Sequence, residues 1–568
     1  MNEITQKIRE HVISRDFASD AQVLIRTNQL GFRPNAPKVA VLETEGSLTF
    51  RLIECTTGKV VDEQIIQAEK KDFGCVAEYR FSHITAPGTY YIQAGKFRSY
   101  PFHIRDGVLD DAFTYPVTYF AAQRCGPSTT GYMTPCHCED GIRMDNGKRQ
   151  DVTGGWHDAS DLRKWVSATI EGMVGLAMVY ELQGDVTGAG GILEELQWGN
   201  RYFLNMQEPE GYVMKHCGGD VFTHSDSNHW TDNEIGTEDD RVICTDPEGM
   251  AGQFRFITAQ AMTARVARTQ GDEAYAQRCL EAADRCLSWC MQQLNDDITV
   301  EALGDGMTAG LELYRTTGQG RYLNTASRLA DRIMELQVHD YQPVRGFFRT
   351  SRTNPEPYRN IVGDPVGIGL CLMLEHASNH PDAERWRFCL QEWVTDYIVP
   401  MQKGSGYGLV PFGLYSWNAG GERRCGDKYY FRYFMGLHDQ IEASSGHSWW
   451  VGINAHAAAM GIAMAKASVI LEMPELLEIA QRQLDWILGA NPFDESTMDL
   501  VGRNHHTTFD GKLFVPNTPR IRGAVLNGLG GSEEDLPDMH DGSYHTCEYW
   551  TPMVCHTMWL AALLKNME

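Results

Sequence analysis

The chain has 568 residues, of which 42% are hydrophobic and 10% are aromatic, which is enough for a large core and more than one domain. Its formal net charge of −25 excludes nucleic acids and anionic membranes as natural partners, because both are negatively charged themselves. No stretch approaches the roughly 18 apolar residues of a membrane span. We therefore expect a partner that is uncharged or cationic, such as a neutral glucan or an amino sugar.

Residues 1–21 form a polar N-terminal arm without the apolar segment of a secretory signal. The sequence as written therefore predicts a cytoplasmic protein, and a secreted one only if a signal has been removed. The 15 cysteines are an odd number, and several, such as Cys279, Cys286 and Cys290, share one face of an expected helix. This distribution favours a reducing compartment. The oligomeric state is not indicated.

Residues 22–105 have the pattern of a small all-β sandwich. Short alternating runs at 38–42, 48–53 and 88–93 are separated by glycine, proline and charged residues. Alternation at this spacing is typical of half-buried strands in two packed sheets.

Residues 106–568 are mainly helical. Apolar residues recur at intervals of three and four, which predicts helices at 247–269, 272–294, 301–316, 320–337, 362–378, 383–400, 448–471 and 474–488. Long links rich in glycine, aromatic and acidic residues separate them, at 207–245, 339–361, 402–440 and 489–543. Loops of this length in a compact domain are usually functional, so we expect them to form a cleft on one rim.

The most informative segment is Asp151-Val-Thr-Gly-Gly-Trp-His-Asp-Ala-Ser-Asp161. Gly154 and Gly155 permit a tight turn, after which the pattern predicts a helix over 159–183. Asp158 and Asp161 would then share one helix face, near N–H groups that favour ionised carboxylates. An ionised carboxylate is what a general base requires. The alternative is that Asp158 only caps the helix and Asp161 is a first-turn acid.

A third acid, Glu548, lies in an aromatic setting near the other end of the chain. Tyr544, Tyr549 and Trp550 surround it in sequence and would raise the pKa of its carboxyl by desolvation, as a general acid needs. The alternative is an ordinary acid at the start of the last helix, expected over 551–564.

These segments resemble glycoside hydrolase family 9, the inverting cellulase family, over nearly the whole chain. Residues 151–161 are similar to the family's Asp-Val-Ser-Gly-Gly-Trp-(Tyr/His)-Asp-Ala-Gly-Asp, and residues 488–492 to its Leu-Gly-x-Asn-Pro. The run at 523–528 followed by 544–548 resembles Gly-Ala-Leu-Val-Gly-Gly and Tyr-x-x-Asn-Glu, with Cys547 in place of the asparagine. His505-His506 resembles His-His-Arg, with Thr507 in place of the arginine.

The resemblance implies a fold and a mechanism. The fold is mainly α, an (α/α)6 barrel at 106–568 preceded by an immunoglobulin-like β-sandwich at 22–105. In an inverting mechanism one acid protonates the leaving oxygen while a carboxylate activates water on the opposite sugar face, with carboxyls about 6.5–9.5 Å apart. Glu548 would be the acid and Asp161 the principal base, with Asp158 holding the same water.

Substrate-binding residues follow from the motif and from the aromatic loops. The resemblance implies His505 and His506, with Arg503 or Arg520 replacing the missing arginine. Flat aromatic faces match the C–H face of a pyranose, so the loop aromatics are candidates for sugar stacking, although core packing is the alternative for each of them. They are Trp230, Tyr407, Trp417, Trp449, Trp450 and Tyr544.

A structural zinc ion is implied by a further set of residues. Zinc-bearing relatives use a cysteine, a Cys-His pair and the histidine before the first motif aspartate, which correspond in this chain to Cys125, Cys136, His137 and His157. Two thiolates and two imidazoles make a closed tetrahedral zinc site, with Cys138 as a substitute ligand. Calcium, which is common in the family, would find acidic groups at 226–240.

The expected function is hydrolysis of β-1,4-glucosidic bonds in cellulose, related β-glucans and cello-oligosaccharides, by an endoglucanase. A cytoplasmic exo-β-glucosaminidase or another exo-acting glycosidase on short oligosaccharides is the main alternative. A non-catalytic carbohydrate-binding protein is disfavoured because all three acids are present. A terpene-cyclase-like Mg²⁺ and diphosphate site is excluded, because a further aspartate-rich motif and basic phosphate ligands are missing.

Overall fold

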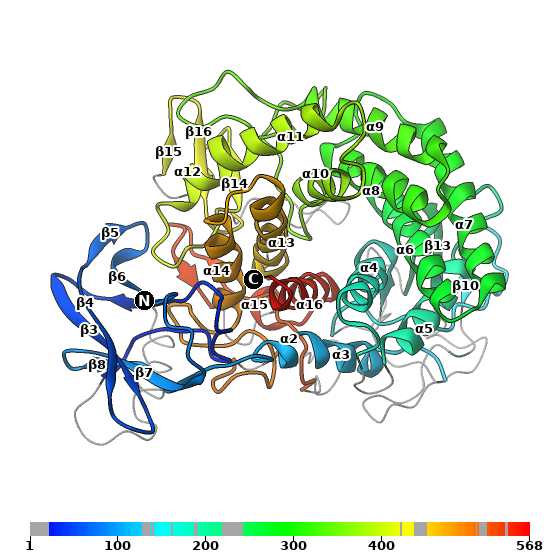
Figure 1. Cartoon of the computed structure of the whole chain (residues 1–568). Helices are drawn as coiled ribbons and strands as arrows, with labels where there is room; N and C mark the ends of the chain where they lie inside the picture. Colours follow the sequence, from blue (N-terminus) through cyan, green and yellow to red (C-terminus); the bar gives the residue numbers. More distant parts are fainter. Residues whose placement is uncertain are drawn as a thin grey trace.

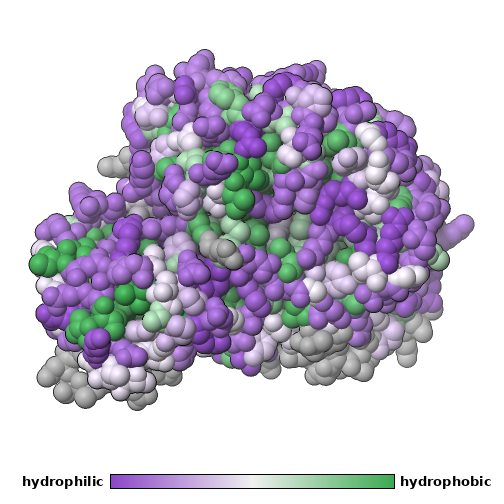
Figure 2. All heavy atoms as spheres, in the orientation of Figure 1, coloured by the Kyte–Doolittle hydropathy of each residue, from purple (hydrophilic) through white to green (hydrophobic). Residues whose placement is uncertain are grey.

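A computed structural model describes residues 22–127, 138, 141–160, 163–186, 191–218, 242–420, 423–436, 451–506, 508–509, 520–539 and 544–567. A β-rich N-terminal domain lies against one side of a large helical domain (Figure 1). Hydrophilic residues cover most of the visible face of the molecule, and hydrophobic residues appear there in small groups (Figure 2). In the described part of the chain, no helix is both long and apolar enough to cross a lipid bilayer.

The N-terminal domain is a sandwich of two sheets. The first has the order β1 (Gln22–Val23), β8 (Phe97–Arg98), β7 (Gly88–Ala94), β3 (Ser47–Glu54) and β4 (Val60–Gln67), with β9 (Phe102–Ile104) beside β7. The second has the order β2 (Val39–Glu43), β6 (Gly74–Arg80) and β5 (Glu69–Lys71). The alternating runs at 38–42, 48–53 and 88–93 are therefore strands, and their inward residues, such as Phe50 and Tyr79, bury the space between the sheets.

The helical domain is a ring of inner helices. They are α4 (Val166–Gln183), α6 (Met250–Thr269), α8 (Val300–Thr317), α10 (Pro365–His376), α13 (Asn454–Ile470) and α16 (Thr551–Lys565). Each contacts the next, and α16 returns to α4, so the ring closes (Figure 1).

Outer helices cover the ring. They are α5 (Ile192–Asn205) on α4, α7 (Glu273–Gln293) on α6, α9 (Gly320–Met334) on α8, α11 (Ala383–Glu392) on α10, α14 (Leu476–Ile487) on α13 and α2 (Asp110–Thr114) on α16. The chain also forms α3 (Pro116–Ala122), η1 (Trp393–Ile398), α12 (Val399–Gln402) and α15 (Tyr544–Cys547). The (α/α)6 barrel and the helices expected between 247 and 488 are confirmed.

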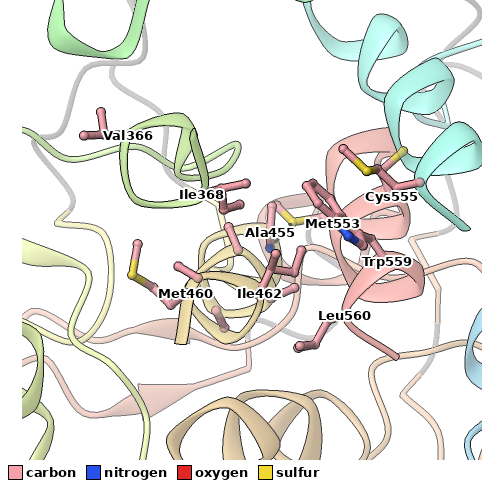
Figure 3. Close-up of a cluster of buried hydrophobic side chains, with 14 of the residues drawn as sticks. Val366, Ile368, Ala455, Met460, Ile462, Met553, Cys555, Trp559 and Leu560 are labelled. Atoms are coloured by element: carbon pink, nitrogen blue, oxygen red, sulfur yellow. Dashed lines mark hydrogen bonds between the residues drawn. The ribbon is translucent and has the colours of Figure 1, made fainter. Parts of the chain in front are cut away.

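The inner helices α4, α10, α13 and α16 are largely apolar around their circumference because both of their faces are buried, whereas α6 and α8 also bury charged residues such as Arg255 and Asp305. Residues of α10, α13 and α16 pack together between helices, including Ile368, Ile462 and Trp559 (Figure 3). Glycines permit the closest approaches: a Cβ on Gly175 of α4 would lie 2.8 Å from the Cβ of Cys555 on α16. On the outer helix α7, Cys279, Cys286 and Cys290 share the buried face expected from their spacing.

Inner and outer helices alternate along the chain, so the inner helices run in one direction and their N-terminal ends form one rim. The loops at this rim contain three small sheets. They are β10 (Ile142–Arg143), β13 (Val242–Pro247), β12 (Met214–Gly218) and β11 (Lys164–Trp165); β14 (Gly413–Tyr415), β16 (Tyr429–Arg432) and β15 (Arg424–Cys425); and β17 (Gly530–Gly531) with β18 (Pro537–Asp538).

The sandwich is attached to the barrel by buried polar contacts. The Asn28 side chain donates to Asp485 at 2.8 Å, and Arg482 pairs with Glu78 at 2.7 Å. The side-chain carbonyl of Gln29 accepts the backbone N–H groups of Arg503 and Asn504, at 2.9 and 3.0 Å. The N-terminal domain therefore holds the segment that leads directly into His505 and His506.

Candidate active site

Asp158 lies in a loop and not at the start of a helix. Its N–H donates to the carbonyl of Arg163 at 3.1 Å, Lys164 and Trp165 pair with β12, and α4 begins only at Val166. The prediction that the helix begins at residue 159 is wrong, because strand pairing of Lys164 and Trp165 with β12 overrides local helix propensity there. Asp161 lies outside the described residues.

The C-terminal segment holds Asp158 in place. The Asp158 carbonyl accepts the Tyr119 hydroxyl at 3.0 Å and the Thr551 N–H at 2.9 Å, and the carboxylate accepts the indole N–H of Trp550 at 3.1 Å. The Asp158 side chain is buried. Trp550, expected beside Glu548, therefore also orients Asp158.

Glu548 is held in turn by a residue of the segment that carries Asp158. Its carboxylate accepts the N–H of Ser160 at 3.2 Å and also the Ser160 hydroxyl. The Glu548 carbonyl accepts the N–H of Asn527 at 2.7 Å. The helix expected after it begins at Thr551, as predicted. Asp158 and Glu548, which are far apart in sequence, thus lie at one place on the rim. A residue close to each acid in sequence binds the carboxylate of the other.

The glycine turn before Asp158 is tightly packed. Gly154 and Gly155 have φ of 88° and 72°, values that favour glycine, so the turn forms as predicted. Trp156 lies against Gly199 of α5, where a Cβ would be 2.0 Å from the indole ring. The Trp156 N–H donates to buried Glu195 at 3.1 Å, and Arg124 binds the same carboxylate at 3.0 Å. The loop that carries Asp158 is therefore fixed to the outer helix α5.

Two of the four expected zinc ligands lie together. Arg124 and Trp156 form an antiparallel bridge, so Cys125 and His157 project from the same face of the two segments. Both side chains are fully buried. Cys136, His137 and the acidic stretch 226–240 lie outside the described residues. Among the residues that the structure does describe, no group of three or more His, Cys, Asp and Glu is placed to hold a metal ion.

His505 and His506 have different surroundings. His505 is partly exposed; burial lowers its pKa, and the charges of Asp499 and Arg520 act on it in opposite directions. Arg520 binds Asp499 at 2.9 Å, whereas Arg503 binds Asp494 and lies over the ring of Tyr100 in the sandwich. Of the two arginines considered at this site, Arg520 is therefore the one beside His505.

His506 is buried and has Glu495 and Cys547 as neighbours. Its Nδ1 lies 2.8 Å from Glu495 Oε2, and it makes a further hydrogen bond to Cys547. Burial opposes protonation of the ring, but these bonds and the charges of the two partners outweigh burial and raise the pKa of His506 to about 10. The imidazole is therefore positively charged at neutral pH.

The aromatic candidates divide by exposure. Trp417 and Tyr544 are each 39% exposed and remain suitable for stacking on a sugar. Tyr407 is buried and donates its hydroxyl to Glu43 of the sandwich at 2.6 Å, so it belongs to the domain interface. Trp230, Trp449 and Trp450 lie outside the described residues.

Sequence reasoning missed a group of charged residues around the barrel axis. Arg255 binds Glu171 and Asp305 at 3.1 and 3.0 Å, and all three line a cavity with Asp364. Burial raises the pKa of Asp364 to about 7, although backbone N–H groups oppose the shift. Each of these residues lies on a different inner helix or at its start, so no local pattern connects them.

Comparisons with known proteins agree with this geometry. Residues 110–361 match the model of glycosyl hydrolase family 9, and residues 20–99 match that of the cellulase N-terminal ig-like domain. Endoglucanase D of Acetivibrio thermocellus is 26% identical, covering 74% of this chain and 68% of that protein. A cellodextrinase of Butyrivibrio fibrisolvens is 24% identical, covering 91% and 90%.

Solved structures show the same fold. A Bacteroides ovatus GH9 protein superimposes with a TM-score of 0.71 at 17% identity, covering 95% of this chain and 98% of that one. A metagenome-derived glycoside hydrolase family 9 endoglucanase gives 0.69 at 23% identity, covering 95% and 99%. The two matched domain models together span more than half of the chain, and the barrel agrees with them, so the chain belongs to glycosyl hydrolase family 9.

Proposed function

We propose that the protein is an inverting endo-β-1,4-glucanase that hydrolyses cellulose, related β-glucans and cello-oligosaccharides. The observation that carries the proposal is the mutual support of the two acid segments, in which Ser160 binds Glu548 and Trp550 binds Asp158. An acid and a base that work on opposite faces of one sugar must be held at a fixed separation. These crossed hydrogen bonds fix Glu548 relative to Asp158, which is proposed to hold the attacking water.

In this mechanism Glu548 gives its proton to the leaving glycosidic oxygen. Asp161 removes a proton from the attacking water, and Asp158 accepts a second hydrogen bond from the same water and orients it. The indole N–H of Trp550 stabilises the ionised form of Asp158. After proton transfer, the two Ser160 donors stabilise the Glu548 carboxylate.

Cys125, Cys136, His137 and His157 are proposed to bind a structural zinc ion. The common face of Cys125 and His157 supports this, because ligands of a tetrahedral ion must converge. Zinc bound there would anchor the turn before Asp158 and supply no chemistry. Metal analysis of the purified protein should give one zinc per chain, and Cys125→Ser should lose it and lower the unfolding temperature. Unchanged zinc content in that variant would exclude Cys125 as a ligand.

Exo-action on short oligosaccharides is the second candidate. It is supported by similarity to a cellodextrinase over 91% of the chain, and the net charge of −25 suits a cationic amino sugar such as glucosamine. Parallel digestion of carboxymethyl-cellulose, cellohexaose and chitosan tetraose separates the cases. A rapid fall in viscosity with mixed cello-oligosaccharides establishes the endoglucanase. Stepwise release of glucosamine, with cellulose unchanged, establishes an exo-glucosaminidase.

A further inference from the structure

His506 is buried, whereas a side chain that binds a sugar is expected to reach the surface of the cleft. Its Nδ1 lies 2.8 Å from Glu495 Oε2, and the Cys547 side chain is its second neighbour. Nδ1 is therefore already committed to a partner inside the protein, and the ring is closed off from solvent.

Cys547 connects this histidine to the catalytic acid. It is the residue directly before Glu548 and is fully buried. Its carbonyl accepts the N–H of Phe509 at 2.9 Å, and the next carbonyl, of Glu548, accepts the N–H of Asn527 at 2.7 Å. The peptide that carries the acid is therefore held by its backbone at two points and by the Cys547 side chain at a third.

Glu495, the residue that binds His506, is also held in a fixed position. The N–H of Glu495 donates to the Asn491 side chain at 3.3 Å, and that side chain donates to the Glu495 carbonyl at 2.8 Å. The Glu495 carboxylate is thus presented from a closed turn. A charged imidazole between a carboxylate and a sulfur atom makes stronger hydrogen bonds than a neutral one. Raising the pKa of His506 to about 10 keeps that charge throughout the neutral range.

We propose that His506 is a positioning residue, which with Glu495 and Cys547 fixes the backbone that carries the proton donor Glu548 and does not contact the sugar. The proposal rests on the proposed function of Glu548 as general acid. It assigns the two neighbouring histidines different tasks, because His505, partly exposed beside Arg520, remains the one able to meet substrate.

The test exploits the leaving group. A natural β-1,4 linkage needs protonation by Glu548, whereas 2,4-dinitrophenolate leaves without it. We expect His506→Gln to lower kcat on cellohexaose by about 10²-fold, the order that a small misplacement of a catalytic group produces, with little change in KM. On 2,4-dinitrophenyl β-cellobioside the same variant should keep nearly full kcat. Glu495→Gln and Cys547→Ala should show the same contrast, and Cys547→Asn, which retains a hydrogen-bonding side chain, should show a smaller loss than Cys547→Ala.

His380→Gln is the matched control, because His380 also lies close to an aspartate, 3.6 Å from Asp382, but in the loop that joins α10 to α11. This variant should leave kcat unchanged on both substrates. Equal losses on the two substrates, or a raised KM on both, would overturn the proposal and make His506 a sugar contact. Wild-type turnover is measured first: if the wild type cleaves neither cello-substrate, the proposed function fails, and the same pair of leaving groups on β-glucosaminides then tests His506.

Discussion

The inner ring and the rim of the barrel are built by different kinds of contact. In the ring, α4 and α16 approach through Gly175 and Cys555, and stability comes from apolar side chains on regular helices. At the rim, Asp158 and Glu548 are held by hydrogen bonds between opposite ends of the sequence. Substitutions in the ring should therefore lower the free energy of unfolding, whereas substitutions at the rim should lower kcat.

The largest effect should follow loss of the proton donor. Glu548→Gln keeps the size of the side chain but cannot donate a carboxyl proton, so kcat on cellohexaose should fall by about 10³-fold or more, at the upper end for general acid catalysis. The unfolding temperature should remain within a few degrees. Steady-state kinetics and calorimetry measure the two. Glu281→Gln, an exposed glutamate on α7, is the control, and a Glu548→Gln variant with normal kcat would remove Glu548 from the mechanism.

A smaller loss should follow removal of the donor to Asp158. Trp550→Phe keeps an aromatic ring but deletes the N–H that binds the Asp158 carboxylate at 3.1 Å. Loss of one hydrogen bond to a charged group corresponds to about 1.5–3 kcal/mol, so kcat should fall about 10- to 100-fold. Trp289→Phe on the outer helix α7 should leave kcat unchanged. If both variants retain full turnover, the Trp550 hydrogen bond to Asp158 does not contribute to catalysis.

Two glycines compare the regions directly. A Cβ at Gly175 meets the α16 backbone, with the Cys555 Cα at 3.0 Å, so Gly175→Ala should lower the free energy of unfolding by about 1–3 kcal/mol while kcat per folded molecule is kept. A Cβ at Gly199 meets the Trp156 ring at 2.0 Å, which displaces the catalytic turn. Gly199→Ala should therefore lower both quantities. Denaturant titration measures the free energy of unfolding, and kinetics normalised to the folded protein measure kcat. Equal retention of kcat by both variants would contradict the contrast between ring and rim.

The smallest effect concerns the pH dependence of stability. The pKa of Asp364 rises from 3.8 to about 7 on folding, so the folded state retains a proton that the unfolded state has lost. This group therefore reduces stability progressively as pH increases from about 4 to about 7. Asp364→Asn cannot ionise and should flatten that decline in urea titrations at pH 5 and pH 8. Asp340→Asn, at an exposed position, should not, and an unchanged slope in Asp364→Asn would show that burial does not control this carboxyl.

The sequence predicted regular elements well because their patterns are local. Alternation at 48–53 marked β3, and intervals of three and four marked the inner and outer helices. The same reasoning failed at residues 159–165, because pairing of Lys164 with Cys217 and the bond from Asp158 to Arg163 depend on distant or non-helical partners. The motifs predicted roles for Glu548 and Asp158. No local pattern revealed that Ser160 binds Glu548, that Glu195 binds Trp156 or that Glu495 binds His506, because these contacts form only when the chain folds.

The most direct test of the central claim is the anomeric configuration of the first products. Cellohexaose is hydrolysed in an NMR tube, and the new reducing ends are observed before mutarotation equilibrates them. An acid and a base separated by a water molecule must invert the anomeric carbon, so the proposed mechanism predicts α-configured reducing ends at early times. Initial β-configured ends would mean that one carboxylate attacks the sugar directly, which would contradict the proposed roles of Asp158, Asp161 and Glu548.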